Sequence, residues 1–166
     1  MSEHHLIAQK TPLKASNACA ALLVLENGRY LMQLRDNKPG IWYPDHWGLF
    51  GGGVEDGEDS QEALIRELNE ELGFVPRQLR YFSRFHFDFA PLGMPVLWRD
   101  FYEVPVTEAE VAQMRLGEGS GLEAVSIGDL LLNRKVTPYD SFALWMHHSA
   151  GLGLYSPNLP RAEHKQ

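Results

Sequence analysis

The segment Gly48–Phe74, GLFGGGVEDGEDSQEALIRELNEELGF, constrains this chain more than any other stretch. Three consecutive glycines, Gly51–Gly53, are followed by eight carboxylates up to Glu71, and Arg66 is the only positive residue among them. The 166-residue chain has 22 acidic residues and a formal net charge of −7, so its acidity is concentrated here. Because carboxylates this dense repel one another, we expect a bound positive charge to offset them.

A helix is predicted over Ser60–Leu72. Ser60 is expected to be its N-cap, and Gly73 is expected to end it in the left-handed conformation. Apolar residues recur at helical spacing and would bury one stripe: Ala63, Leu64, Leu68 and Leu72. The remaining faces of the helix are then left to its acidic residues.

Three glutamates of this helix form a candidate metal site. Glu67 and Glu71 are four residues apart and project from one face, with Glu70 on their flank. Mg²⁺ takes a few carboxylate oxygens together with waters and substrate phosphates. The glycines at 51–53 allow the backbone to approach, so a main-chain carbonyl could join the ligands. A solvated acidic helix without function is the alternative, which the glycines, the lone arginine and the carboxylate spacing disfavour.

The rest of the chain alternates strands and helices. Strands are predicted over 18–25 and 29–35, joined by a turn at Asn27-Gly28, and over 81–90, 95–104 and 122–127. Helices are predicted over 107–114, with Thr107 and Glu110 as a capping box, and over 128–132 and 138–149. This mixture predicts a single α/β domain over residues 16–155, with flexible segments at 1–15 and 156–166.

Composition disfavours several classes of function. The longest apolar runs, such as Ala18–Leu25, are too short to span a bilayer. The net charge of −7 argues against nucleic-acid binding by general electrostatics. Cys19 is the only cysteine, permits no internal disulfide and is predicted to be a buried, inert thiol, which fits a cytoplasmic protein. No Ser/His/Asp or Cys/His constellation suggests a covalent nucleophile.

The segment Gly52–Phe74 resembles the signature of the Nudix hydrolases. Its fixed positions are filled by Gly52, Glu58, Arg66-Glu67-Leu68, Glu70-Glu71, Gly73 and Phe74. The preceding residues are similar to the common lead-in of the family, with Phe50 where a proline is usual. The resemblance implies an α/β/α sandwich with a mixed sheet. It also implies hydrolysis of the diphosphate linkage in a nucleoside diphosphate linked to a group X.

The same resemblance assigns roles to the residues of the signature. It implies these ligands for Mg²⁺ or Mn²⁺: Glu67, Glu70, Glu71 and the nearby Gly51 carbonyl. Arg66 and Glu58 would orient the carboxylates. Metal-bound water would attack phosphorus, with Glu67, Glu70 and Arg66 in the catalytic machinery and no covalent intermediate.

The catalytic base is not fixed by the signature. In this family it is either a glutamate of the signature or one from a distant loop. Residues 116–127, LGEGSGLEAVSI, resemble such a loop, and Glu118 is the first choice, with Glu123 second. The alternative is that Glu118 and Glu123 are both surface glutamates in a flexible loop and that neither is the base.

Candidate substrate contacts lie outside the signature. Arg35 ends a strand and suits phosphate recognition, although a solvated arginine is equally consistent with its position. Trp42, Tyr43 and Trp47 could stack on a base, but a core position is favoured for Trp47. Polar strand faces add three residues that could line a pocket: His86, Asp88 and Arg99.

The sequence does not identify X. A nucleotide sugar, a nucleoside triphosphate, ADP-ribose and a dinucleoside polyphosphate all remain open, as does a homodimer. A non-hydrolytic nucleotide sensor on the same fold is the main alternative function, although no carboxylate of the signature is missing. An isopentenyl diphosphate isomerase would need a cysteine in its pocket, and the predicted burial of Cys19 disfavours it.

Overall fold

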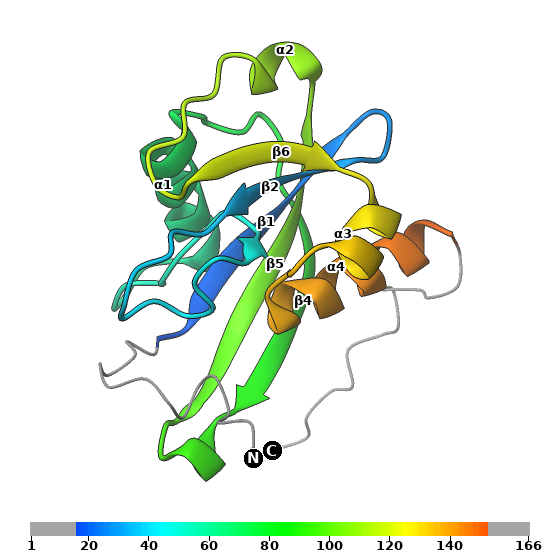
Figure 1. Cartoon of the computed structure of the whole chain (residues 1–166). Helices are drawn as coiled ribbons and strands as arrows, with labels where there is room; N and C mark the ends of the chain where they lie inside the picture. Colours follow the sequence, from blue (N-terminus) through cyan, green and yellow to red (C-terminus); the bar gives the residue numbers. More distant parts are fainter. Residues whose placement is uncertain (1–15, 153–166) are drawn as a thin grey trace.

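The computed structural model describes residues 16–152, which form a six-stranded sheet with helices on both faces (Figure 1). The strands are β1 Ala18–Leu25, β2 Tyr30–Leu34, β3 Trp47–Gly48, β4 Arg80–Asp88, β5 Val96–Val106 and β6 Gly121–Val125. The helices are α1 Ser60–Leu72, α2 Glu108–Val111, α3 Ile127–Asn133 and α4 Pro138–Gly151, with the 3₁₀ turn η1 at Ala90–Leu92. The segments predicted to be flexible, 1–15 and 156–166, lie outside the described residues.

The sheet is mixed, as predicted. Its strand order is β3-β2-β1-β5-β4, and β6 pairs with β2. The pair β1–β5 is parallel, whereas the pairs β1–β2, β2–β3, β2–β6 and β4–β5 are antiparallel. The predicted hairpin between β1 and β2 forms, and Gly28 supplies its left-handed residue at φ 76°.

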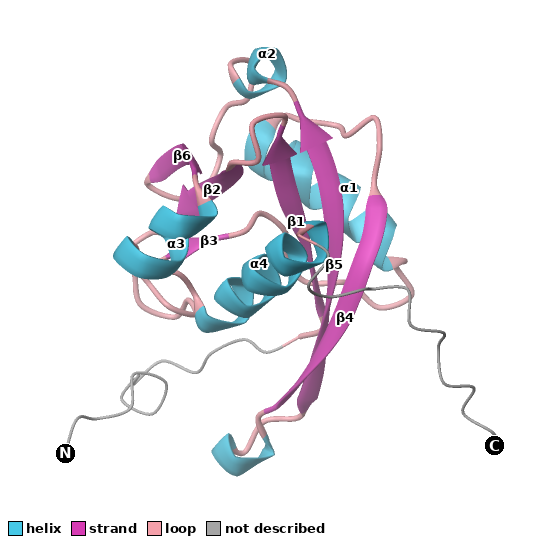
Figure 2. Cartoon of the chain, turned by 90° about the vertical axis from the view of Figure 1, so that its right-hand side faces the viewer, coloured by secondary structure: helices cyan, strands magenta, loops and turns pink. Residues whose placement is uncertain are grey.

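The central strand β1 contributes to two cores. Its residues Cys19, Ala21 and Leu23 face α1, and Ala20 and Leu22 face α3 and α4. Figure 2 shows α4 on one side of the sheet and α1 on the other. Because successive side chains of a strand point to opposite faces, a strand buried on both sides is apolar throughout, as the run ACAALLVL is. The predicted α/β/α sandwich is therefore correct.

The predicted N-cap of α1 is wrong. Asp59 is the N-cap, and its side chain accepts a hydrogen bond of 2.8 Å from the amide of Gln61. Ser60 is the first helical residue, and its hydroxyl donates to buried Asp100 Oδ2 at 2.7 Å. A buried carboxylate needs hydrogen-bond donors, so this long-range contact takes the hydroxyl that local capping would have used.

Several other predicted elements differ in length, among them the strand at 81–90 and the helix at 107–114. The strand predicted over 81–90 ends at Asp88, whose carboxylate accepts a hydrogen bond of 2.9 Å from the amide of Ala90 and begins the turn η1. The helix predicted over 107–114 is only Glu108–Val111, although the capping box between Thr107 and Glu110 is present. Of the helices in residues 16–152, none has the length and apolar character needed to cross a membrane.

Cys19 provides a test of the packed sheet. Burial raises the pKa of its thiol to about 11 from the usual 9.0. Two pH units correspond to about 100-fold less thiolate, and the thiolate is the reactive form. At pH 8 we expect iodoacetamide to alkylate Cys19 at least about 100-fold more slowly in the native protein than in denaturant. Mass spectrometry would follow the adduct, and equal rates would contradict the packing of β1.

Candidate functional site

The glycine loop, Gly51–Gly53, packs directly against two glutamates of α1. The amide of Gly51 donates a hydrogen bond of 2.9 Å to Glu71 Oε2, and Gln33 Nε2 of β2 donates one of 3.4 Å to Glu71 Oε1. A Cβ atom on Gly52 would overlap the carboxylate of Glu67. The absence of a side chain at this position therefore makes room for the Glu67 carboxylate.

The other edge of the glycine loop is bonded to β1. The amide of Cys19 donates to the Gly52 carbonyl at 2.9 Å, and the amide of Ala21 donates to the Phe50 carbonyl at 2.9 Å. Gly51 lies between these bonds at φ 127°, where a Cβ would overlap the Cys19 carbonyl. The loop thus has one edge on the sheet and the other on the glutamates, and the Gly51 carbonyl takes part in neither of the two bonds to β1.

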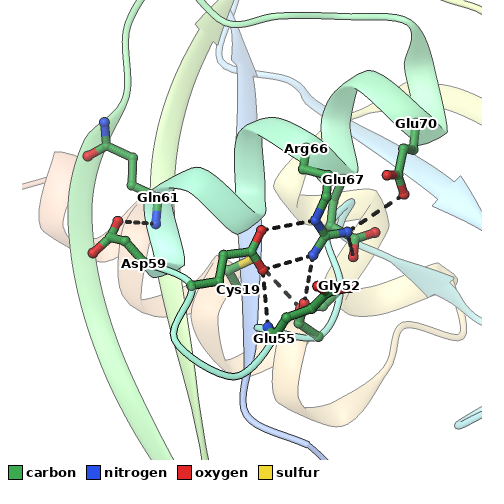
Figure 3. Close-up of polar contacts among 10 residues, drawn as sticks. Cys19, Gly52, Glu55, Asp59, Gln61, Arg66, Glu67 and Glu70 are labelled. Atoms are coloured by element: carbon green, nitrogen blue, oxygen red, sulfur yellow. Dashed lines mark hydrogen bonds and ion pairs between the residues drawn. The ribbon is translucent and has the colours of Figure 1, made fainter.

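Arg66 holds the carboxylates around it in place (Figure 3). Its guanidinium binds both oxygens of Glu58 at 3.0 and 3.1 Å and Glu67 Oε1 at 2.8 Å. It also donates to the Gly53 carbonyl at 3.1 Å and lies 3.6 Å from Glu70 Oε2. The hydrogen bonds from Arg66 hold the pKa of Glu58 below its ordinary value. These contacts suit the orienting role that the sequence analysis gave to Arg66 and Glu58.

Glu71 is the most buried carboxylate of the group, with 8% of its surface exposed. Burial raises its pKa to about 7, against the hydrogen bond from Gly51, and the charges of Glu67 and Glu118 raise it further. In residues 16–152, no three acidic, histidine or cysteine side chains already converge as a ready-made metal site. Arg66 and the Gly51 amide instead hold oxygens that a hard cation prefers as ligands. The donor set thus fits Mg²⁺ or Mn²⁺.

Glu118 lies near Glu71, whereas Glu123 is engaged elsewhere. A cavity of about 60 Å³, here called the smaller cavity, is lined by Glu71, Glu118 and six other residues: Gln33, Arg35, Asp36, Lys38, Ile41 and Gly119. The loop before β6 is anchored to α1, because the amide of Gly117 donates to the Glu71 carbonyl at 2.7 Å. Glu123 on β6 instead pairs with Arg134 at 2.9 and 3.2 Å.

A cavity of about 230 Å³, the larger cavity, adjoins the glycine loop. Besides Gly51–Gly53 its lining is mostly aromatic and basic: Ser16, Ala18, Arg35, Trp42, Phe87, Phe89, Leu97, Trp98, Arg99 and Tyr139. Arg35 lines both cavities, so its side chain lies between them. Three of the predicted substrate contacts, Arg35, Trp42 and Arg99, therefore line the larger cavity.

Trp47, His86 and Asp88 do not line the larger cavity. Trp47 packs against the core beneath α3 and α4, with the Arg134 guanidinium 5.2 Å from its ring. The core position favoured for Trp47 accounts for these contacts, and the geometry offers no support for a substrate contact.

The sequence did not point to most of the residues that line the two cavities, among them Gln33, Lys38, Trp98 and Tyr139. The first two lie near Arg35 in the sequence, at the end of β2 and in the loop after it. Trp98 and Tyr139 reach the larger cavity only through the packing of β5 and α4. A pattern within one segment carries no signal for such a meeting.

Comparison with known proteins decides the family. A family model for the NUDIX domain matches residues 15–146. The chain belongs to the Nudix family. The resemblance carried by Gly52–Phe74 is thereby confirmed.

Relatives of this Nudix chain are similar over different lengths. It is 45% identical over 51 residues to the nucleoside triphosphatase NudI of Enterobacter sp. (strain 638), a match covering 31% of this chain and 36% of that relative. The MutT Nudix hydrolase of Burkholderia pseudomallei has a TM-score of 0.64 and 24% identity, over 80% of this chain and 97% of that one. The Nudix domain of Shewanella oneidensis NrtR, solved with ADP-ribose, has a TM-score of 0.65 and 18% identity, over 93% and 100%. The two structures show the fold alone.

The contact between Gly52 and Glu67 gives a testable prediction. In Gly52→Ala the new Cβ should push the Glu67 carboxylate aside, which the flexible side chain permits without unfolding. We expect Mn²⁺ affinity, measured by titration calorimetry, to fall about 10- to 100-fold with little change in melting temperature.

Gly128→Ala is the matched control, because nothing lies within 4 Å of the added Cβ at that position. Its Mn²⁺ affinity should equal that of the wild type. Unchanged affinity in Gly52→Ala would show that Glu67 is not a ligand.

Proposed function

We propose that the chain is a divalent-metal-dependent hydrolase that cleaves the diphosphate linkage of a nucleoside diphosphate linked to a group X. The observation that carries the proposal is the packing of Glu67 and Glu71 against the glycine loop, with Arg66 fixing Glu67 from the side. Structural carboxylates are rarely gathered this way, because burial and mutual repulsion both cost free energy. A cation would remove that cost.

Each side chain has a part in this proposal. When bound, Mg²⁺ or Mn²⁺ supplies charge neutralisation, a water of lowered pKa and a template for in-line displacement. Glu67, Glu70 and Glu71 provide the ligand oxygens, with the Gly51 carbonyl beside them. Arg66 limits the movement of Glu67 through their bond of 2.8 Å.

Glu118 is the proposed general base. It shares the smaller cavity with Glu71, so it can accept a proton from water that attacks beside the ligand carboxylates. Glu123 is less suited, because its carboxylate is already held by two hydrogen bonds from Arg134. Phosphate oxygens of the substrate would meet Arg35 and Lys38, which line the same cavity as Glu118.

A nucleoside triphosphate or a related derivative is the proposed substrate class, in keeping with the name of the NudI relatives. The alternative of a non-hydrolytic sensor draws on the NrtR domain solved with ADP-ribose. Hydrolysis is favoured over the sensor because Glu58, Glu67, Glu70 and Glu71 are all present. A cytoplasmic location and a homodimer stay predictions.

Metal dependence is the first test. Release of phosphate or pyrophosphate from a panel of nucleotide derivatives should stop in EDTA and return with Mg²⁺ or Mn²⁺. Glu67→Gln keeps the shape but removes a ligand charge, and should lower kcat by about 10²–10³. Glu62→Gln, on the exposed first turn of the same helix, is the control and should match the wild type. Full turnover in chelator would refute the metal proposal.

The second test separates the two loop glutamates. Glu118→Gln should lower kcat by about 10²–10⁴ while Mn²⁺ affinity stays close to wild type, because a base acts after the metal is bound. Glu123→Gln should stay close to wild type in both measurements. The reverse pattern would assign the base to Glu123, and two active variants would return that role to the signature.

A further inference from the structure

Arg99 is a charged side chain in an aromatic setting. It lies on β5 and lines the larger cavity, with only 16% of its side chain exposed. Its guanidinium carbon is 5.0 Å from the centre of the Tyr139 ring and 5.7 Å from that of Phe101. A guanidinium carries five N–H donors, and none of those on Arg99 has a hydrogen bond among the described residues.

Asp140 stands behind Arg99 and is almost fully buried, with 2% of its side chain exposed. Its Oδ2 accepts hydrogen bonds from the Leu49 amide at 3.0 Å and the Thr137 hydroxyl at 2.7 Å. Its Oδ1 has no hydrogen bond and lies 3.6 Å from Arg99 Nη2. Asp140 therefore offsets the charge of Arg99 and fixes its direction. Arg99 Nε is itself buried, so the terminal nitrogens Nη1 and Nη2 are the donors left for a ligand.

The walls of the larger cavity suit a flat ring. Trp42 lies 5.3 Å from Phe89, and Phe87 lies 6.2 Å from both Phe89 and Tyr139, measured between ring centres. On the β5 side Trp98 is held by the Arg84 guanidinium, 3.9 Å from its ring centre. Aromatic faces of this kind stack on any nucleobase, so they supply affinity without distinguishing one base from another.

Selectivity for one base over another must then come from Arg99. An arginine fork pairs with two adjacent acceptors on one edge of a base, and the O6 and N7 atoms of guanine present such a pair. Adenine presents a donor at N6 beside N7, which an arginine cannot satisfy. We propose that Arg99, positioned by Asp140, makes the larger cavity selective for guanine nucleotides.

This inference rests on the proposed function only where it assumes that the bound nucleotide is hydrolysed. Recognition of the base itself needs neither metal nor hydrolysis. The position of Arg35, which borders both cavities, supports the orientation: a base beside Arg99 would direct its phosphates toward Arg35, on the side of Glu71 and Glu118. A phosphate at Arg99 is the competing reading, and the aromatic lining disfavours it.

The experiment is a fluorescence titration of the tryptophans with GMP and AMP in EDTA. The wild type should bind GMP about 10- to 100-fold more tightly than AMP. Arg99→Lys keeps the charge and loses the fork, so the two affinities should become nearly equal. If Arg99 bound the phosphate instead, Arg99→Lys would weaken both nucleotides by the same factor.

A double variant should reverse the preference between GMP and AMP. Glutamine pairs with the N6 and N7 atoms of adenine, so Arg99→Gln/Asp140→Asn, which removes both charges together, should prefer AMP. Arg80→Lys is the control, since Arg80 is an exposed β4 residue paired with Glu103 at 3.0 Å. Its GMP preference should equal that of the wild type.

Three results would overturn the inference: no binding of either nucleotide, equal affinities in the wild type, or a guanine preference that survives Arg99→Lys. Hydrolysis assays with GTP and ATP keep the two proposals apart. A guanine preference in binding without any hydrolysis would contradict the proposed function alone. Hydrolysis without a base preference would contradict the role of Arg99 alone.

Discussion

The site depends on one guanidinium. Arg66 is the only cation between Gly48 and Phe74, and it binds Glu58, Glu67 and the Gly53 carbonyl at once. These contacts join the end of the loop before α1, the helix itself and the glycine loop. Without Arg66, nothing among the described residues would offset the repulsion between Glu58, Glu67 and Glu70 at this point. A planar fork with fixed donor directions can serve three such acceptors, whereas an ammonium would serve them less well.

Much of this arrangement could be predicted because it is local. The spacing of Glu67, Glu70 and Glu71 sets their positions on α1, and Leu64, Leu68 and Leu72 set the face that it buries. Residues two apart in a strand likewise share a face, and Phe87 and Phe89, at the end of β4, both line the larger cavity. In both cases the period of the backbone relates neighbours in the sequence to neighbours in space.

The failures share a different cause. Ser60 does not cap α1, because its hydroxyl binds Asp100, which lies forty residues away in the sequence and reaches α1 only through the sheet. Local sequence also gave no reason to prefer Glu118 over Glu123 beyond the glycines around it, and the pairing of Glu123 with Arg134 depends on how α3 packs after β6. The role of Asp140 was not anticipated, because two of its partners, Leu49 and Arg99, come from segments far away in the sequence. Long-range electrostatic pairing has no signature within one segment.

The strand β5 places opposite charges at consecutive positions. Arg99 points toward Asp140 of α4, and Asp100 points the other way, toward Ser60 of α1 and Arg84 of β4. A one-residue slip of β5 against β1 would exchange the two faces, leaving an arginine among the hydroxyls and a carboxylate against Asp140. Each charge would then be buried without a counterion. The dipeptide Arg99-Asp100 thus fixes the register of β5 against β1. The chain should therefore tolerate an insertion in the loop after α2 far better than the loss of a single residue between Val96 and Arg99.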